Sequence, residues 1–145
     1  VGKIVLFQIA PEEFHRIVEL TEKEHASFSE IEKRLEVPPH GYLGEYIANK
    51  WRLPMVIRMS IRYHHFDVRK MDTILESMKP VVQAVSLANL IVNKAKIGYS
   101  GNAANIIITE EQLEPLGLKA EQVAAIEEKV IKEMDNVGGF LRSAA

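Results

Sequence analysis

Residues 39–54 read PHGYLGEYIANKWRLP, and His64 and His65 follow ten residues later. Proline interrupts a helix, so Pro38-Pro39 should end the preceding helix and leave His40 at the start of the next one. Neutral imidazole is a common metal ligand and a frequent general base. These histidines therefore raise the question of whether the chain is an enzyme.

The helix that begins at His40 should have one apolar face. Three large apolar residues fall on that face: Leu43, Ile47 and Trp51. Gly41 and Gly44 leave room for a neighbouring backbone to approach. We expect Trp51 to lie in the core and Leu53-Pro54 to form a turn, rather than either serving as a ligand platform.

The composition is that of one soluble globular domain. The chain has 145 residues, of which 47% are hydrophobic and 26% charged. A formal charge of −2 gives no reason to expect nucleic acid or an anionic membrane as a partner. There is no cysteine, which excludes disulfides and thiolate chemistry, and no apolar run is long enough to span a bilayer. We expect a cytoplasmic protein.

The remaining patterns predict an all-α protein. Helical spacing and capping signals predict helices over about residues 11–23, 55–65 and 119–136, one that is capped by Ser27 or Ser29 and runs to about Leu35, one that opens at Pro80, and a short one between Thr109 and Gly117. Their dense apolar residues place 55–65 and 81–92 in the core. Residues 71–78 should form a turn or short helix, residues 106–108 a short strand or an extended connector, and Gly138-Gly139 should end the last helix.

Four ordered blocks resemble the HDOD branch of the HD superfamily. They are Val1-Gly2-Lys3-Ile4-Val5-Leu6, His40-Gly41-x-x-Gly44 with Trp51-x-Leu53-Pro54, His64-His65, and Ala84-Val85-x-Leu87-Ala88-Asn89-Leu90. The resemblance implies a compact multi-helix bundle, with residues 1–100 as the C-terminal portion of the HDOD core and residues 101–145 as a helical extension packed on the same domain. It also implies that helices preceding Val1 are missing.

The resemblance also indicates which metal ligands have been lost. Active HD phosphohydrolases hold their metal with a first His, a His-Asp pair and a later Asp, and this chain has Asn89 where the later Asp is expected. An amide oxygen is a weaker ligand than a carboxylate. The related cyclic-dinucleotide phosphodiesterases continue their His-His pair with Glu, where this chain has Phe66. We therefore assign no catalytic residue, cofactor or metal ligand, and treat His40, His64, His65 and Asn89 as remnants of a site.

Each of these residues also has a structural interpretation. His64 and His65 would end a buried helix, as cationic rings near its last carbonyls or as hydrogen-bonded neutral rings. His40 could be a hydrogen-bonded residue at a helix start. His15 and His25 should be solvated, and the acidic run between Glu12 and Glu36 should form a solvated helical face.

Four basic residues are candidates for contact with a phosphate or an acidic partner: Lys3, Arg58, Arg62 and Arg69. The last three, with Lys70, should cluster around the histidine pair. The simpler interpretation is surface charge, with Lys3 exposed or ion-paired.

Three hypotheses follow. In the first, the chain is a non-catalytic bacterial signal-transduction module of HDOD type that binds a signalling protein or a small effector. In the second, it is a phosphohydrolase that acts on nucleotides or cyclic dinucleotides with a divalent transition metal. In the third, it is a fragment whose apolar stretch Ile4–Ile9 is normally covered, so that the isolated chain forms homo-oligomers.

Overall fold

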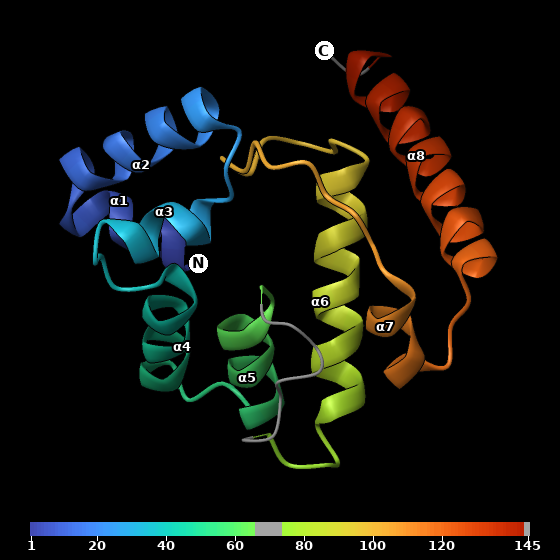
Figure 1. Ribbon diagram of the computed structural model, residues 1–145, viewed down its shortest axis with the longest axis horizontal. Helices are drawn as coiled ribbons and strands as arrows, with labels where there is room; N and C mark the ends of the chain where they lie inside the picture. Colours follow the sequence, from blue (N-terminus) through green and yellow to red (C-terminus); the bar gives the residue numbers. More distant parts are fainter. Residues whose placement is uncertain (66–73, 144–145) are drawn as a thin grey trace.

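The computed structural model describes residues 1–65 and 74–143, and every regular element within these ranges is a helix. The elements are α1 (Gly2–Ile9), α2 (Pro11–Glu24), α3 (Phe28–Arg34), α4 (His40–Lys50), α5 (Met55–Tyr63), α6 (Lys79–Lys94), α7 (Glu110–Leu113), η2 (Glu114–Leu116) and α8 (Ala120–Ser143). The predicted all-α architecture is confirmed. Figure 1 shows α1 to α4 on one side, α6 to α8 on the other, and α5 between them. No described helix combines the length and apolarity needed to cross a bilayer.

The α1–α4 group closes around a tightly enclosed core. Four apolar side chains in it are at most 1% exposed: Leu6, Ile17, Phe28 and Ile31. Helix α3 begins with a capping box, in which the Glu30 backbone N–H donates to Ser27 Oγ at 3.2 Å and the Ser27 backbone N–H donates to Glu30 Oε2 at 2.8 Å. Ser27 is therefore the cap, and the helix carries Phe28 and Ile31 into the core.

Glycines let α4 lie very close to both of its neighbours. A Cβ at Gly2 of α1 would stand 1.7 Å from the His40 carbonyl oxygen, and one at Gly41 would stand 2.6 Å from the Arg62 carbonyl oxygen on α5. A Cβ at Gly44 would stand 2.7 Å from a side chain of α5. The predicted close approach at Gly41 and Gly44 is confirmed. It fixes the start of α4, and hence His40, between α1 and α5.

The apolar residues of α5 and α6 are less buried than their density predicts. On α5, Met55 and Ile57 are 47% and 43% exposed. On α6, three residues are buried (Val82, Leu87 and Ile91), whereas three others are exposed (Val81, Val85 and Val92). The prediction that both segments lie deep in the core is therefore wrong, because these helices also line an open cavity, and apolar content does not distinguish a core wall from a cavity wall.

The prediction that Trp51 lies in the core is also wrong, because its side chain is 64% exposed. It is the C-cap of α4, so the backbone leaves the helix before continuing that face. The turn predicted at Leu53-Pro54 lies at Trp51-Arg52 instead, and Leu53-Pro54 connects it to the start of α5.

The C-terminal part differs from the prediction in one place. Residues 106–108 form no strand, so of the two predicted alternatives the connector is the one found. Gly117 ends η2 with φ of 63°, as predicted, but α8 runs through Gly138-Gly139 to Ser143 instead of stopping near Asn136. Glycine lowers helix propensity by about 1 kcal/mol relative to alanine, which weakens a helix without ending it. In the predicted turn or short helix at 71–78, residues 74–78 form a bend and turns before α6, and residues 71–73 lie outside the described ranges.

Candidate functional site

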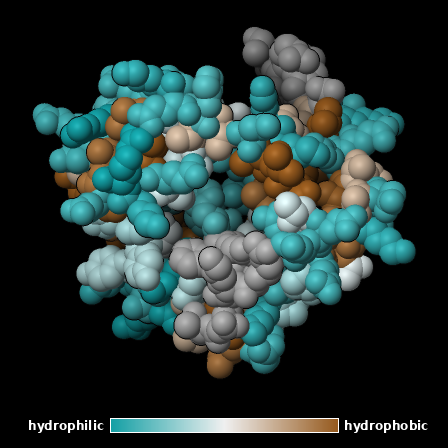
Figure 2. All heavy atoms as spheres, in the orientation of Figure 1, coloured by the Kyte–Doolittle hydropathy of each residue, from teal (hydrophilic) through white to brown (hydrophobic). Residues whose placement is uncertain are grey.

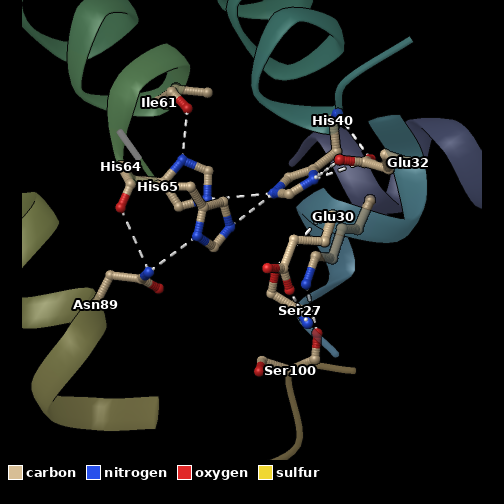
Figure 3. Close-up of polar contacts among 10 residues, drawn as sticks. Ser27, Glu30, Glu32, His40, Ile61, His64, His65, Asn89 and Ser100 are labelled. Carbon is tan, nitrogen blue, oxygen red and sulfur yellow. Dashed lines mark hydrogen bonds and ion pairs between the residues drawn. The ribbon is translucent and has the colours of Figure 1, made fainter. Parts of the chain in front are cut away.

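Three histidines that are remote in sequence meet at one point. His40 begins α4, and His64 and His65 directly follow α5. Their rings point toward one another in Figure 3, with His40 Nε2 lying 3.0 Å from His65 Nε2 and 3.3 Å from His64 Nε2. Asn89 of α6 completes the group, because its amide nitrogen lies 3.2 Å from His65 Nδ1. The structure thus brings together all four residues that the sequence singled out as remnants.

A buried carboxylate holds His40 in place. Glu32 of α3 is 1% exposed and accepts hydrogen bonds from the His40 backbone N–H at 2.8 Å and from its ring Nδ1–H at 2.9 and 3.0 Å. Its place in the acidic run predicted a solvated face for this glutamate, and that prediction is wrong for this residue. Glu32 follows buried Phe28 by four residues, so helical spacing already put it on the apolar face of α3. A carboxylate at such a position needs a buried donor, and His40 supplies two.

The other two imidazoles are neutral at neutral pH. Burial, with a smaller effect from the neighbouring His40, lowers the pKa of His64 to about 4, although the Ile61 carbonyl that accepts its Nδ1–H at 2.7 Å opposes the shift. Burial and the adjacent His64 and His40 lower the pKa of His65 to about 2. Of the two structural interpretations, the hydrogen-bonded neutral ring describes these residues.

Lys3 lies beside the cluster rather than at the surface. Its Nζ stands 4.2 Å from the centre of the Phe28 ring and donates to the Ser100 carbonyl oxygen. Burial lowers its pKa to about 8, and the negative charge of Glu32 partly opposes that shift. Lys3 was predicted to be exposed or ion-paired. It is half-buried, and its polar partner is a backbone carbonyl.

The arginines do not surround the histidines as predicted. Arg58 and Arg62 of α5 both face Glu45 of α4, at 3.9 and 3.7 Å, and the Arg62 guanidinium stacks 3.8 Å from the centre of the Tyr42 ring. They therefore join α4 to α5 and do not line the cavity beside the histidines. Arg69 and Lys70 lie outside the described residues.

The histidine cluster forms a small polar part of the wall of a large apolar cavity. The cavity encloses about 1120 Å³ between α1 and α2 on one side and α5 and α6 on the other. Its apolar wall includes Val18, Val56, Ile57, Val81, Val85 and Val92. Figure 2 shows the recess in this face of the molecule, with apolar surface beside it on the α6–α8 side.

The residues present do not fit the divalent metal of the phosphohydrolases. The three imidazoles offer ligand atoms within 4.8 Å of one another, but no carboxylate oxygen joins that group among the described residues. Asn89 turns its N–H groups toward His65 and the His64 carbonyl. A donor in that position opposes a cation, because it presents positive partial charge where a metal ligand must present a lone pair.

Comparison with known proteins identifies a family over the N-terminal part of the chain. Residues 1–66 match the model of the HDOD domain, while neither the curated proteins nor the solved structures yielded a match. The matched stretch runs from α1 to the histidine pair, and so contains Glu32 and His40. The Ala84–Leu90 block lies beyond it, and the division into residues 1–100 and 101–145 stays a prediction. The predicted HDOD resemblance is thus confirmed over residues 1–66.

Proposed function

We propose that this chain is a non-catalytic regulatory module of bacterial signal transduction, which acts in the cytoplasm by binding a protein partner or a small effector in the cavity. The observation that carries the proposal is the pairing of a large apolar cavity with a histidine cluster in which His64 and His65 are neutral and to which, among the described residues, no carboxylate adds a metal ligand. Phosphoester hydrolysis needs groups that stabilise negative charge. Neutral imidazoles in an apolar wall favour binding instead.

The charge of the chain supports the same class of partner. A net charge of −2 offers no general attraction to nucleic acid or to an anionic membrane. The two arginines of α5, Arg58 and Arg62, face Glu45, which leaves them poorly placed to bind phosphate. An apolar ligand or an apolar protein segment matches the cavity better.

Binding in the cavity is tested with 1-anilinonaphthalene-8-sulfonate, a dye whose fluorescence rises in apolar sites. We expect the dye to bind the wild type, and Val85→Asp to reduce its affinity at least tenfold. Val85 lines the cavity and is 38% exposed, so the charge should be tolerated by the fold. Ile131→Asp on α8, at a residue that is 41% exposed and outside the cavity lining, is the matched control. Equal affinity in all three proteins would contradict binding at this site.

A metal-dependent phosphohydrolase remains the alternative, favoured by the convergence of three imidazole nitrogens. Elemental analysis of untagged protein purified without chelator separates the two functions, with His64→Ala as the control. We expect no stoichiometric transition metal and no hydrolysis of bis(4-nitrophenyl) phosphate or cyclic dinucleotides. A metal that is lost in His64→Ala, together with hydrolysis by the wild type, would establish the alternative. Size-exclusion chromatography in the same preparation tests whether the chain forms homo-oligomers.

A further inference from the structure

Backbone carbonyls fix the orientation of two amides beside the cluster. Asn93 Nδ2 donates to the Asn89 carbonyl oxygen at 2.7 Å, and Asn89 Nδ2 lies 3.4 Å from the His64 carbonyl oxygen. A carbonyl only accepts, so both contacting atoms must be nitrogen. The side-chain bonds agree, since Asn93 Nδ2 donates to Asn89 Oδ1 at 3.1 Å and Ser100 Oγ donates to Asn93 Oδ1 at 2.6 Å.

These amides set the tautomer of His65. The N–H of Asn89 points at His65 Nδ1 from 3.2 Å, so Nδ1 must accept and the ring proton must sit on Nε2. That proton faces His40 Nε2 at 3.0 Å. His40 keeps its own proton on Nδ1, where Glu32 accepts it at 2.9 Å. Every bond from Ser100 to Glu32 therefore runs in the same direction.

His64 is not part of this chain of hydrogen bonds, and a different contact fixes its tautomer. Its Nδ1–H donates to the Ile61 carbonyl oxygen at 2.7 Å, which leaves a lone pair on Nε2. The nearest ring nitrogen is His40 Nε2 at 3.3 Å, whose lone pair already accepts the His65 proton. Among the described residues, nothing donates to His64 Nε2, and the ring lies in the cavity wall.

We infer that this one-way chain of hydrogen bonds excludes a metal from the histidine cluster and makes His64 Nε2 an acceptor for the hydroxyl or amide N–H of a neutral, largely apolar ligand. The inference deepens the proposed function, on which its ligand class rests. A metal would need the lone pair of His65 Nε2, which carries a proton. Moving that proton to Nδ1 would set it against the N–H of Asn89. A phosphodiester carries only acceptor oxygens on its phosphate, so it could not donate to His64 Nε2.

Tautomers are read directly from long-range ¹H–¹⁵N spectra of the full chain at neutral pH. We expect the ring proton on Nε2 of His65 and on Nδ1 of His64 and His40. A proton on His65 Nδ1 would overturn the inference. The tautomer measurement does not depend on activity, so it can contradict the inference while the proposed function stands. The proposed function would instead be overturned by hydrolysis with the wild-type protein.

Asn89→Asp tests the exclusion of metal. The new carboxylate can accept from His65 Nδ1–H and would free Nε2, so we expect zinc affinity to rise by about 10- to 100-fold over the wild type. Asn105→Asp is the matched control, because it makes the same substitution at an exposed residue outside the hydrogen-bond chain. Calorimetric titration with zinc, supported by circular dichroism to confirm folding, gives the comparison. Equal gains in both variants, or wild-type binding as tight as that of Asn89→Asp, would overturn the inference.

A pair of probes tests the acceptor. Phenol and anisole have similar apolar rings, but only phenol carries an O–H donor. We expect phenol, which donates a hydrogen bond, to shift the ¹⁵N resonance of His64 Nε2 upfield by roughly several parts per million. Anisole has no O–H donor and should leave that resonance close to its position without a probe. Equal shifts with both probes, or no shift with phenol, would refute the acceptor role.

Discussion

The two sides of this bundle are built with different degrees of enclosure. On the α1–α4 side, the four central apolar side chains are at most 1% exposed, and glycine contacts bring the backbones together. On the α6–α8 side, the corresponding cluster of Leu87, Ile91, Leu113 and Val123 is 2 to 5% exposed. Both sides leave apolar residues exposed outside these clusters, such as Ile4 and Ile9 of α1 at 64 and 66% and Ile131 and Met134 of α8 at 41 and 44%, so the difference in enclosure lies in the clusters themselves.

The site takes one part from each side. Glu32 and His40 come from the enclosed side, where packing and buried hydrogen bonds hold them. Val81, Val85 and Val92 come from α6, where the same cavity leaves them exposed. This arrangement suits ligand binding. The fixed polar groups can set the orientation of a ligand, and the apolar wall of α6 supplies apolar surface for it to bury.

Phe28→Ala should produce the largest effect and would test the enclosure of the α1–α4 side. Removing a fully buried ring leaves a cavity in close-packed surroundings, so we expect the free energy of unfolding to fall by about 3 to 5 kcal/mol. Leu113→Ala is the counterpart on the other side and should cost about 2 to 3 kcal/mol. Urea denaturation measures both. A larger loss for Leu113→Ala would reverse the comparison.

Glu32→Ala should come next, because it leaves two buried donors of His40 without their acceptor. We expect a loss of about 3 kcal/mol in the free energy of unfolding, measured by urea denaturation. Glu30→Ala, in the same helix but exposed and engaged only in the capping box, should cost about 0.5 kcal/mol. Equal losses would show that Glu32 is not an anchor of the site.

Sequence patterns predicted helices better than they predicted burial. Capping residues and prolines located the starts of α2, α3 and α4, since these signals act over only a few residues. The sequence patterns could not show that the exposed valines of α6 face a cavity, because this depends on how far the helices opposite α6 lie from it. The histidines and Asn89 were selected by family resemblance. Glu32 was missed, although its spacing from Phe28 placed it on the buried face.

Acid should lower the free energy of unfolding through His64 and His65, which lie where the two sides meet. Both have lowered pKa values, so between pH 6.5 and 4 the unfolded chain binds protons at these rings while the folded chain does not. The free energy of unfolding must then fall as the pH falls, by about 1 kcal/mol per pH unit after allowance for partial exposure. For His65 the loss continues toward pH 2.

The control for this pH dependence is the double variant His64→Gln/His65→Gln, measured by urea denaturation at each pH. It retains Lys3 and His40, the neighbouring groups that act on the pair. We expect a flatter slope between pH 6.5 and 4 than in the wild type. Identical slopes would place the acid sensitivity elsewhere in the chain.

The outer face of α8 should produce the smallest effect. Ile131 is 41% exposed, so Ile131→Ala should change the free energy of unfolding by less than about 0.5 kcal/mol. Val123 lies in the same helix but is 4% exposed, and Val123→Ala removes two buried methyl groups at a cost of about 1.5 kcal/mol. Urea denaturation at two protein concentrations measures both variants. If Ile131→Ala proved as costly as Val123→Ala, and more so at high concentration, a second copy of the chain would be covering α8. The outer face of α8 would then be an interface, because a second copy of the chain would cover the apolar residues that are exposed in one copy.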